Sequence, residues 1–275
     1  MTLLISWVGF DNKKDGPKPA SVYIASDSRI SWTNNNHFDF CRKVYGFKNS
    51  PDILGYCGDV LFPSIVLSQL IDIGDQGLLF NFSATCNEKH AAIKEKLVQL
   101  FLRYPKEVSG ISTNNLQILH ASRDSNKEFH CYILEWIKNT NDFSTKEATF
   151  NNFSDKLFIL GSGKNEFLKK FDLYQKSINQ KTSRALFHCF CDTLSEIKDQ
   201  YCGGAPQLIG LYRKENARFY GIIKDNKRYL LGVEISNLFN FHNIEWRNEL
   251  FEVCDGETME IKSKAQRQPN PVVVL

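Results

Sequence analysis

The first ten residues constrain the fold of this chain more than any other stretch. The segment Met1-Thr-Leu-Leu-Ile-Ser-Trp-Val-Gly-Phe10 concentrates large apolar side chains between positions 3 and 8. A short run of this kind is typical of a strand that is covered on both faces. It lacks the basic region, longer apolar core and small-residue cleavage site of a secretory signal. We therefore expect a buried strand that opens the domain with no leader before it.

Thr2 stands immediately before this strand, and its position gives it a potential chemical role. Cells commonly remove an initiator Met that precedes a small residue, which would leave Thr2 with a free α-amine. The unperturbed pKa of such an amine, about 7.7–8.0, lies close to working pH. The amine can then act as the base that activates the threonine hydroxyl as a nucleophile. The alternative is that Thr2 is only the second residue of an ordinary strand.

The overall composition excludes several classes of protein. The chain has 275 residues, of which 42% are hydrophobic and 24% charged, as in ordinary globular proteins of one large domain or two small ones. Its net charge is only +3 and it has no basic block with interleaved aromatic residues, so we expect no nucleic-acid partner. No stretch approaches the ~18 apolar residues of a membrane span, so we expect no membrane partner.

The cysteine and histidine patterns give no sign of a metal site. The sequence has eight cysteines but no CxxC pair, and its six histidines form no HExxH or His-x-His arrangement. We therefore expect no metal and no cofactor. Without a secretory signal, reduced thiols and a cytoplasmic location are the default. The 21 phenylalanines indicate a heavy core or a subunit interface.

The order of predicted elements indicates a layered α+β fold. Strands, two helices, strands, two helices and strands follow one another, which favours a sandwich of two antiparallel sheets flanked by helices. Periodicity weakens after residue 235, so we expect one domain over 1–235 and a C-terminal extension over 236–275 that is partly disordered or docks on a neighbour. The expected strands lie near 1–10, 20–25, 43–47, 53–57, 115–121, 128–136, 156–160, 206–213, 217–223 and 228–234, the expected helices near 62–73, 87–103, 164–177 and 182–201, and the expected long loop near 11–19.

A set of short motifs at the ends of these elements resembles one family. The motifs are Thr2, Ala25-Ser-Asp-Ser-Arg29, Lys43-Val-Tyr45, Gly58, Gly161-Ser-Gly163 and Lys198-Asp-Gln-Tyr-Cys-Gly-Gly204. In order and spacing, over about residues 2–234, they resemble proteasome β-subunits and the bacterial HslV peptidases. The resemblance implies the αββα sandwich of the N-terminal nucleophile (Ntn) hydrolases. It also implies a threonine peptidase that cleaves polypeptides inside a self-associated ring, with an ATP-dependent unfoldase or regulator as partner.

The same resemblance implies a role for each motif residue. Thr2 would attack the substrate carbonyl, and the Lys43 ammonium would keep the Thr2 amine neutral because a like charge disfavours protonation. Asp27 would hold Lys43 as a cation, and the Gly58 N–H would meet the developing oxyanion. Three further residues would surround the amine and relay protons, namely Ser162, Asp199 and Cys202. The family usually has Ser where this chain has Cys202, and a thiol is the poorer hydrogen-bond donor.

The resemblance also implies a substrate pocket without charged walls. It would be lined by Ile30, Ser31, Cys41, Tyr45, Tyr56 and Val60. Burying a charged substrate side chain there without a partner would cost several kcal/mol, so we expect cleavage after neutral apolar residues of small to middle size. A shift of one residue in the strand register would instead turn the Asp59 carboxylate into the pocket.

Each motif also has a structural alternative. Asp27 and Arg29 could form a simple ion pair at a turn, Lys43 could be a solvated strand residue, and Ser162 could cap the helix that follows it. At the level of function, two alternatives differ from a peptidase. One is a non-proteolytic amidohydrolase that uses Thr2 on a small amide, and the other is a catalytically silent scaffold subunit of a proteasome-like assembly.

Overall fold

The computed structural model describes residues 2–14, 16–32, 36–106, 116–236, 240–263 and 265. The larger sheet has nine strands, which are, in spatial order, β10 (Asp155–Leu160), β1 (Leu4–Lys13), β2 (Gly16–Ser26), β11 (Gln207–Tyr212), β12 (Arg218–Lys224), β13 (Lys227–Leu230) and β14 (Val233–Glu234), with β15 (Glu245–Asn248) beside β12 and β16 (Val253–Cys254) beside β15. The smaller sheet has five strands, β5 (Val44–Gly46), β6 (Asp52–Gly58), β7 (Leu116–Arg123), β8 (Phe129–Ile137) and β9 (Asp142–Glu147). A separate short hairpin consists of β3 (Ile30–Ser31) and β4 (His37–Phe38).

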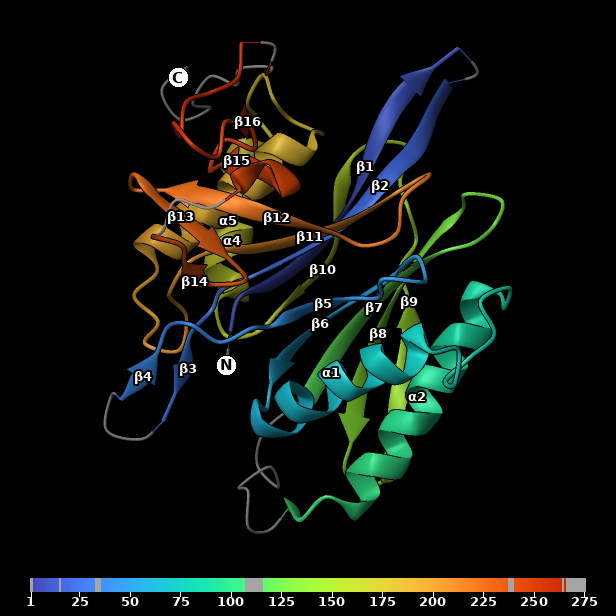
Figure 1. Ribbon diagram of the computed structural model, residues 1–275. Coiled ribbons are helices and arrows are strands. Elements are labelled where there is room, and N and C mark those ends of the chain that lie inside the picture. Colours follow the sequence, from blue (N-terminus) through green and yellow to red (C-terminus); the bar gives the residue numbers. More distant parts are fainter. Residues whose placement is uncertain are drawn as a thin grey trace.

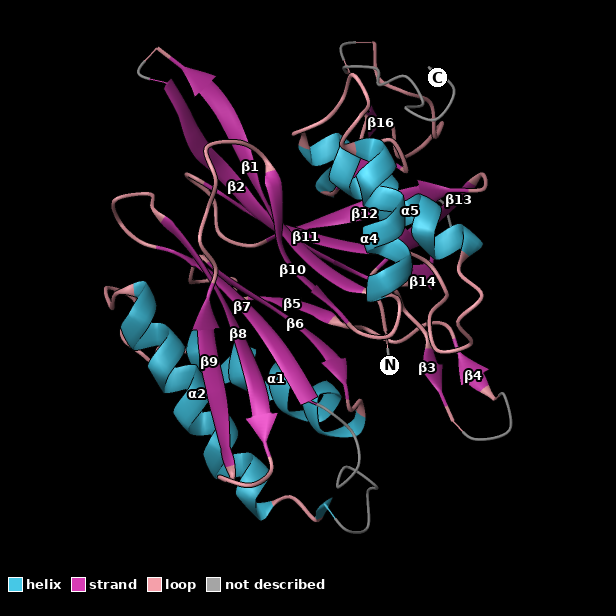
Figure 2. Cartoon of the chain, turned by 180° about the vertical axis from the view of Figure 1, so that it is seen from behind, coloured by secondary structure: helices cyan, strands magenta, loops and turns pink. Residues whose placement is uncertain are grey.

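Two pairs of helices cover the outer faces of the two sheets (Figures 1 and 2). The helices are α1 (Leu61–Asp75) and α2 (Cys86–Arg103) on the smaller sheet, and α4 (Lys164–Tyr174) and α5 (Ser183–Glu196) on the larger one. The result is an αββα sandwich, which confirms the predicted fold class. Within the part of the chain that the structure describes, no helix is both long and apolar enough to cross a bilayer.

The N-terminal strand lies at the centre of this arrangement, with apolar contacts on both of its faces. Leu3, Ile5 and Trp7 belong to the core between the larger sheet and α4 and α5. Leu4 and Val8 belong to the core between the two sheets. Successive side chains of a strand point to opposite faces, so the continuous apolar run fills two cores at once. This agrees with the prediction of a strand covered on both sides.

Polar segments near both ends of the larger sheet form strands that the sequence pattern did not indicate. The expected loop at 11–19 instead continues the hairpin, with Asp11 opposite Lys18 and β1 pairing with β2 as far as Gly16. After residue 235, β15 pairs in parallel with β12, and the Trp246 ring packs where a side chain on Gly221 would stand. The last ten residues of the expected extension over 236–275 lie outside the described residues.

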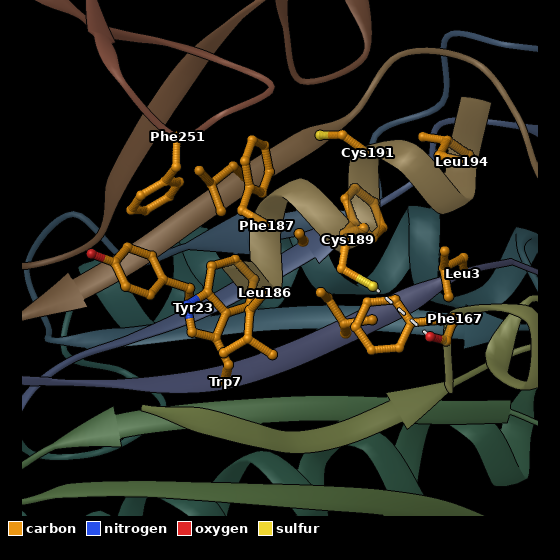
Figure 3. Packing of buried hydrophobic residues seen from close by; sticks show 14 of the residues in the cluster. Leu3, Trp7, Tyr23, Phe167, Leu186, Phe187, Cys189, Cys191, Leu194 and Phe251 are labelled. Carbon is orange, nitrogen blue, oxygen red and sulfur yellow. Dashed lines mark hydrogen bonds between the residues drawn. The ribbon is translucent and has the colours of Figure 1, made fainter. Parts of the chain in front are cut away.

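The turn between β15 and β16 also contributes to the core beneath α5. Phe251 packs edge-on against Tyr23, with ring centroids 5.5 Å apart, and Trp7 stacks on Tyr23 at 4.9 Å (Figure 3). Phe187 of α5 lies against Phe251 at 5.4 Å. These aromatic contacts link a segment after residue 235 to the first strand of the chain. All eight cysteines are buried free thiols, as expected from the sequence.

The fourth predicted helix is shorter than expected. α5 begins with the Thr182 side chain accepting a hydrogen bond from the Ala185 N–H, and it ends at Glu196 rather than near residue 201. The chain leaves the helix because Ile197 adopts an extended conformation, with φ −63° and ψ 130°. As a consequence, Asp199 and Cys202 lie in the loop between α5 and β11 and are free of helical geometry.

Candidate active site

Thr2 precedes β1, Asp27 follows β2 and Lys43 precedes β5, and hydrogen bonds bring their three side chains together. The Thr2 hydroxyl donates a hydrogen bond to Asp27 Oδ1 at 2.9 Å. The Lys43 ammonium donates to the same carboxylate oxygen at 2.8 Å and also to Thr2 Oγ1. None of the three residues is more than 1% exposed. The structure therefore brings together the hydroxyl, the cation and the anion that the sequence singled out.

The Asp27 carboxylate is compensated by backbone donors as well as by Lys43. Leu3 N–H donates to Oδ1 at 3.2 Å, while Arg29 N–H and Gly203 N–H donate to Oδ2 at 3.2 and 3.1 Å. A buried charge needs this kind of pairing and hydrogen bonding. The Arg29 guanidinium pairs with Asp39 and not with Asp27, and Lys43 is fully buried. The two alternatives, a turn ion pair for Asp27 and a solvated strand lysine for Lys43, are therefore wrong.

A glycine-flanked turn closes around the backbone of Thr2. Gly163 N–H donates to the Thr2 carbonyl at 3.3 Å. Gly161 has φ +89°, and a Cβ at that position would fall 1.9 Å from the Thr2 carbonyl oxygen. Only glycine fits such a conformation at such a distance. α4 begins after Gly163 without a side-chain cap, so the interpretation of Ser162 as a helix cap is also wrong.

Ser162, Cys202 and Asp199 form a second cluster beside this turn. The Cys202 thiol lies 3.5 Å from Ser162 Oγ and donates to Asp199 Oδ2, also at 3.5 Å. Burial, reinforced by the Asp27 charge, raises the pKa of Cys202 to about 12, so the sulfur keeps its proton at neutral pH. A Cβ on Gly163 would lie 3.2 Å from this sulfur. The cluster therefore packs against the turn that holds Thr2.

Gly58 ends β6 and begins the turn into α1. It pairs with Leu116 in the sheet and has φ +96°, a conformation that favours glycine. The next residue, Asp59, accepts a hydrogen bond from Phe62 N–H at 3.1 Å, and burial raises the pKa of its carboxyl group. Asp59 thus binds the first turn of α1. The Asp59 carboxylate therefore faces α1, and the shift in strand register that would turn it into the predicted pocket is not seen.

Three of the predicted pocket residues lie together. The Cys41 sulfur is 3.4 Å from the Tyr56 hydroxyl, and the Tyr45 and Tyr56 rings are 6.3 Å apart. Both tyrosine hydroxyls donate to the Arg42 carbonyl, at 3.4 and 3.3 Å. Burial raises the pKa of Tyr45 to about 12. The three side chains are therefore uncharged, and the Arg42 guanidinium lies beside them, 4.5 Å from the centroid of the Tyr45 ring.

The other predicted pocket residues come from neighbouring elements. Ile30 and Ser31 form the half-buried strand β3, and the Ser31 hydroxyl donates to the Gln200 carbonyl at 3.1 Å. Val60 precedes α1 and packs on the core of the smaller sheet. The structure gathers Cys41, Tyr45 and Tyr56 into one group, whereas Ile30 and Ser31 lie on β3 and Val60 precedes α1.

Two polar residues near the site were missed by the sequence analysis. Asp39 binds the Arg29 guanidinium with both carboxylate oxygens, at 2.7 and 2.9 Å, and this bonding lowers the pKa of Asp39. Gln207 is fully buried beside Asp27 and Lys43. The only signal for Gln207 is an amide at the head of the apolar run Gln207–Tyr212. For Asp39, opposite charge ten positions from Arg29 was the only sign.

Comparisons with known proteins identify the fold. The sequence matches no protein-family model and no curated protein. Among solved structures, Anbu of Pseudomonas aeruginosa, described as a helical assembly, matches with a TM-score of 0.57 and 14% identity over 82% of this chain and 86% of that one. Anbu (ancestral β-subunit) of Yersinia bercovieri matches with 0.51 and 13% over 76% and 82%. HslV of Trypanosoma brucei gives 0.46 and 14% over 76% and 99%. At these identities, the two Anbu structures show a shared fold.

Proposed function

We propose that this chain is an N-terminal nucleophile hydrolase, a threonine peptidase whose nucleophile is Thr2 after removal of Met1. The observation that carries the proposal is the buried contact of the Thr2 hydroxyl with Lys43 and Asp27. A fully buried lysine and aspartate are costly to maintain unless they have a specific role. The fold shared with the Anbu structures supports the same proposal.

The proposed reaction begins at the Thr2 hydroxyl. The free α-amine of Thr2 takes the hydroxyl proton while Oγ1 attacks the carbonyl carbon of the substrate. The Lys43 ammonium, in contact with Oγ1, favours the neutral amine before attack and stabilises the negative charge that develops on the oxygen. Asp27 keeps Lys43 in place through its carboxylate. The proposed oxyanion donor is the Gly58 N–H.

The second half of the reaction returns the enzyme to its starting state. The tetrahedral intermediate collapses, the protonated amine gives its proton to the leaving nitrogen, and the acyl group remains on Thr2 Oγ1 as an ester. Water then attacks this ester while the amine accepts its proton. The bond between the acyl carbon and Oγ1 breaks, the amine returns the proton to Oγ1, and the carboxylic acid product leaves. Ser162, Cys202 and Asp199 are proposed to keep the amine oriented, since their cluster packs against the turn at Gly163.

The pocket and the assembly complete the proposal. Cys41, Tyr45 and Tyr56 form an uncharged group, which supports cleavage after neutral apolar residues of small to middle size.

The Pseudomonas neighbour is described as a helical assembly, and by analogy this chain is proposed to self-associate. From the resemblance to proteasome β-subunits and HslV, it is also proposed to receive polypeptides from an ATP-dependent unfoldase. An amidohydrolase of small amides and a silent scaffold that retains Met1 are the competing functions.

One experiment separates these functions. Intact mass reports whether Met1 is removed, and an epoxyketone or β-lactone inhibitor reports whether Thr2 is reactive. We expect Thr2→Ala to abolish both labelling and turnover of a fluorogenic peptide panel, while Thr2→Ser retains measurable turnover. Lys43→Ala should be about as damaging as Thr2→Ala, because residues that act as one unit are not additive.

Each competing function has its own outcome in this experiment. Full activity of Thr2→Ala would contradict the mechanism, and preferred cleavage after Arg would contradict the assigned pocket. Turnover of small amides without turnover of any peptide would identify the amidohydrolase. Retained Met1 together with no labelling would identify the scaffold.

A further inference from the structure

Gln207 is a buried polar residue without a role in the proposed reaction. It opens β11, whose following residues Leu208 and Ile209 are apolar, and its side chain has no exposure to solvent. Its amide oxygen accepts a hydrogen bond from Lys43 N–H at 3.0 Å. Its amide nitrogen donates to the Cys41 carbonyl at 2.8 Å and to the Asp27 carbonyl at 3.1 Å. Both amide protons and one acceptor site are therefore used.

The three backbone groups that Gln207 binds lie just outside the strands. Asp27 follows the last residue of β2, and Cys41 and Lys43 precede the first residue of β5. At such positions the regular pairing of a sheet no longer supplies partners, yet buried backbone groups must be paired. The Gln207 amide takes the place of the missing strand neighbour. It is thereby a direct polar link between the main chain of Asp27 and that of Lys43.

Neighbouring contacts fix the orientation of this amide. Cys41 N–H donates to the Ser28 carbonyl at 2.9 Å, and Tyr56 N–H donates to the Lys43 carbonyl at 3.2 Å, so the segment is held on both sides. A Cβ on Gly232 would lie 2.6 Å from Ser28 Cβ and 3.4 Å from the Gln207 amide nitrogen. Gly232 therefore lies close to the amide, and a larger residue at this position would press on Ser28 and Gln207.

We infer that Gln207 is a positioning residue for the proposed hydrolase. It sets the spacing between the main chains of Asp27 and Lys43, so that the Lys43 ammonium reaches the Asp27 carboxylate and the Thr2 hydroxyl together. Gln207 itself touches no reacting atom. The inference rests on the proposed function, because it assigns to the amide the task of holding the Lys43 charge where it acts on Thr2.

The test removes the amide group of Gln207 while keeping the length of the side chain. Gln207→Met keeps the length of the side chain but makes none of the three hydrogen bonds, so the Lys43 ammonium can move away from Thr2. With the like charge farther away, the α-amine of Thr2 should bind its proton more tightly. In protein that has lost Met1, we expect the pKa of this amine to rise by about one unit. The pH dependence of its carbamylation by cyanate, followed by mass spectrometry, measures this pKa without requiring peptide turnover.

Peptide kinetics provide a second measure. We expect kcat of Gln207→Met to fall by at least about tenfold with KM changed less than about twofold, because small displacements of catalytic groups are costly while the pocket is unaltered. Gln207→Asn serves as a second variant in case Gln207→Met does not fold. Its amide is one carbon shorter and adds no charge, so it cannot reach all three backbone groups at once, and it should raise the amine pKa in the same direction.

The control is Thr193→Val, which removes a buried hydrogen bond from Thr193 Oγ1 to the Cys189 carbonyl inside α5. It should lower the melting temperature without changing the amine pKa. A folded Gln207→Met or Gln207→Asn whose amine pKa equals that of the wild type overturns the positioning role, whatever its melting temperature. If the wild type turns over no peptide but the Gln207 variants still shift the amine pKa, the positioning role is supported and the proposed peptidase is contradicted.

Discussion

At the scale of single residues, the sequence predicted the chemical groups better than their supports. Thr2, Asp27 and Lys43 belong to the motifs that resemble proteasome β-subunits, and that resemblance indicated a common site. Gln207 reaches Lys43 and Asp27 across 164 and 180 positions. A single amide at the head of an apolar strand is equally compatible with an exposed strand end. Its partners could therefore be recognised only in the folded chain.

Cys202 offers a prediction at this scale. Its thiol makes long contacts of 3.5 Å with Ser162 and with Asp199. A hydroxyl would donate a shorter and stronger bond to a carboxylate than a thiol does. Cys202→Ser should therefore hold the cluster beside Thr2 more firmly and raise kcat by up to about fivefold, equivalent to about 1 kcal/mol.

The matched control for this change is Cys254→Ser. Cys254 is also a buried thiol that contacts a carbonyl, that of Glu252, but it lies in β16. Its replacement should leave peptide turnover at the wild-type rate. The measurement is kcat for peptide turnover by the two variants and the wild type under the same conditions. Slower turnover in Cys202→Ser than in the wild type would show that the weaker thiol contacts are not what limits the reaction.

At the scale of elements, what could be predicted depends on how local the signal is. α1 and α2 begin within one residue of their predicted starts, and α2 carries a capping box between Thr85 and Glu88. The outer part of the β1–β2 hairpin has a polar sequence, which resembles a loop, and only pairing between the strands makes it a ladder. β15 has four residues and pairs with the distant strand β12. In both cases the strand depends on its pairing partner, so a short stretch of sequence around it does not predict it.

The contact of α2 with the smaller sheet contains a buried polar network. Lys89 and His120 bind opposite oxygens of Asp52, at 3.2 and 2.9 Å. His90 Nδ1 lies 3.1 Å from His120 Nδ1, and its ring stacks on Tyr132 at 4.1 Å. Burial, reinforced by His120, lowers the pKa of His90 to about 3. Burial alone would raise the pKa of Asp52, but His120 and Lys89 hold it below its usual value.

The histidine predicts how stability depends on pH. Between about pH 6.5 and pH 3 the unfolded chain protonates His90 and the folded chain does not, so acidification favours unfolding by up to about 1.4 kcal/mol per pH unit. The lowered pKa of Asp52 adds stability that is present above about pH 3.9 and lost only as the pH falls through its folded value. His90→Gln should therefore make the free energy of unfolding less dependent on pH between 6 and 4, as measured by urea titration.

His130→Gln is the control for this prediction. His130 is also a histidine of the smaller sheet, but it is partly exposed and pairs with Glu147 at 2.7 Å. Its replacement should leave the steep dependence on pH in place. If His90→Gln retains the wild-type slope, protonation of His90 does not contribute to acid unfolding.

At the scale of the whole molecule, the outer helix α1 has two large apolar residues one turn apart on its solvent side. Leu61 and Ile65 of α1 are 53% and 47% exposed, whereas Val66 and Leu70 are buried in the core of the smaller sheet. The helical periodicity separates these two sets onto opposite faces. Exposed large apolar residues on one face often mark a contact with another protein. In the proposed assembly, this face of α1 would meet a second copy of the chain.

Charges on this face should therefore prevent self-association without unfolding the protomer. Leu61→Glu with Ile65→Glu would place two carboxylates without partners in a contact that excludes water, at a cost of several kcal/mol. Leu173→Glu on α4, which alters a 50% exposed leucine on the opposite helix layer, is the matched control. We expect light scattering to give the mass of an assembly for the wild type and the control, and the mass of a single chain for the double variant. Because the charges lie on the outer face of α1 and alter no contact among Thr2, Asp27 and Lys43, inhibitor labelling of Thr2 should persist in the dissociated protein. An assembly that survives both charges would place its contacts on another face.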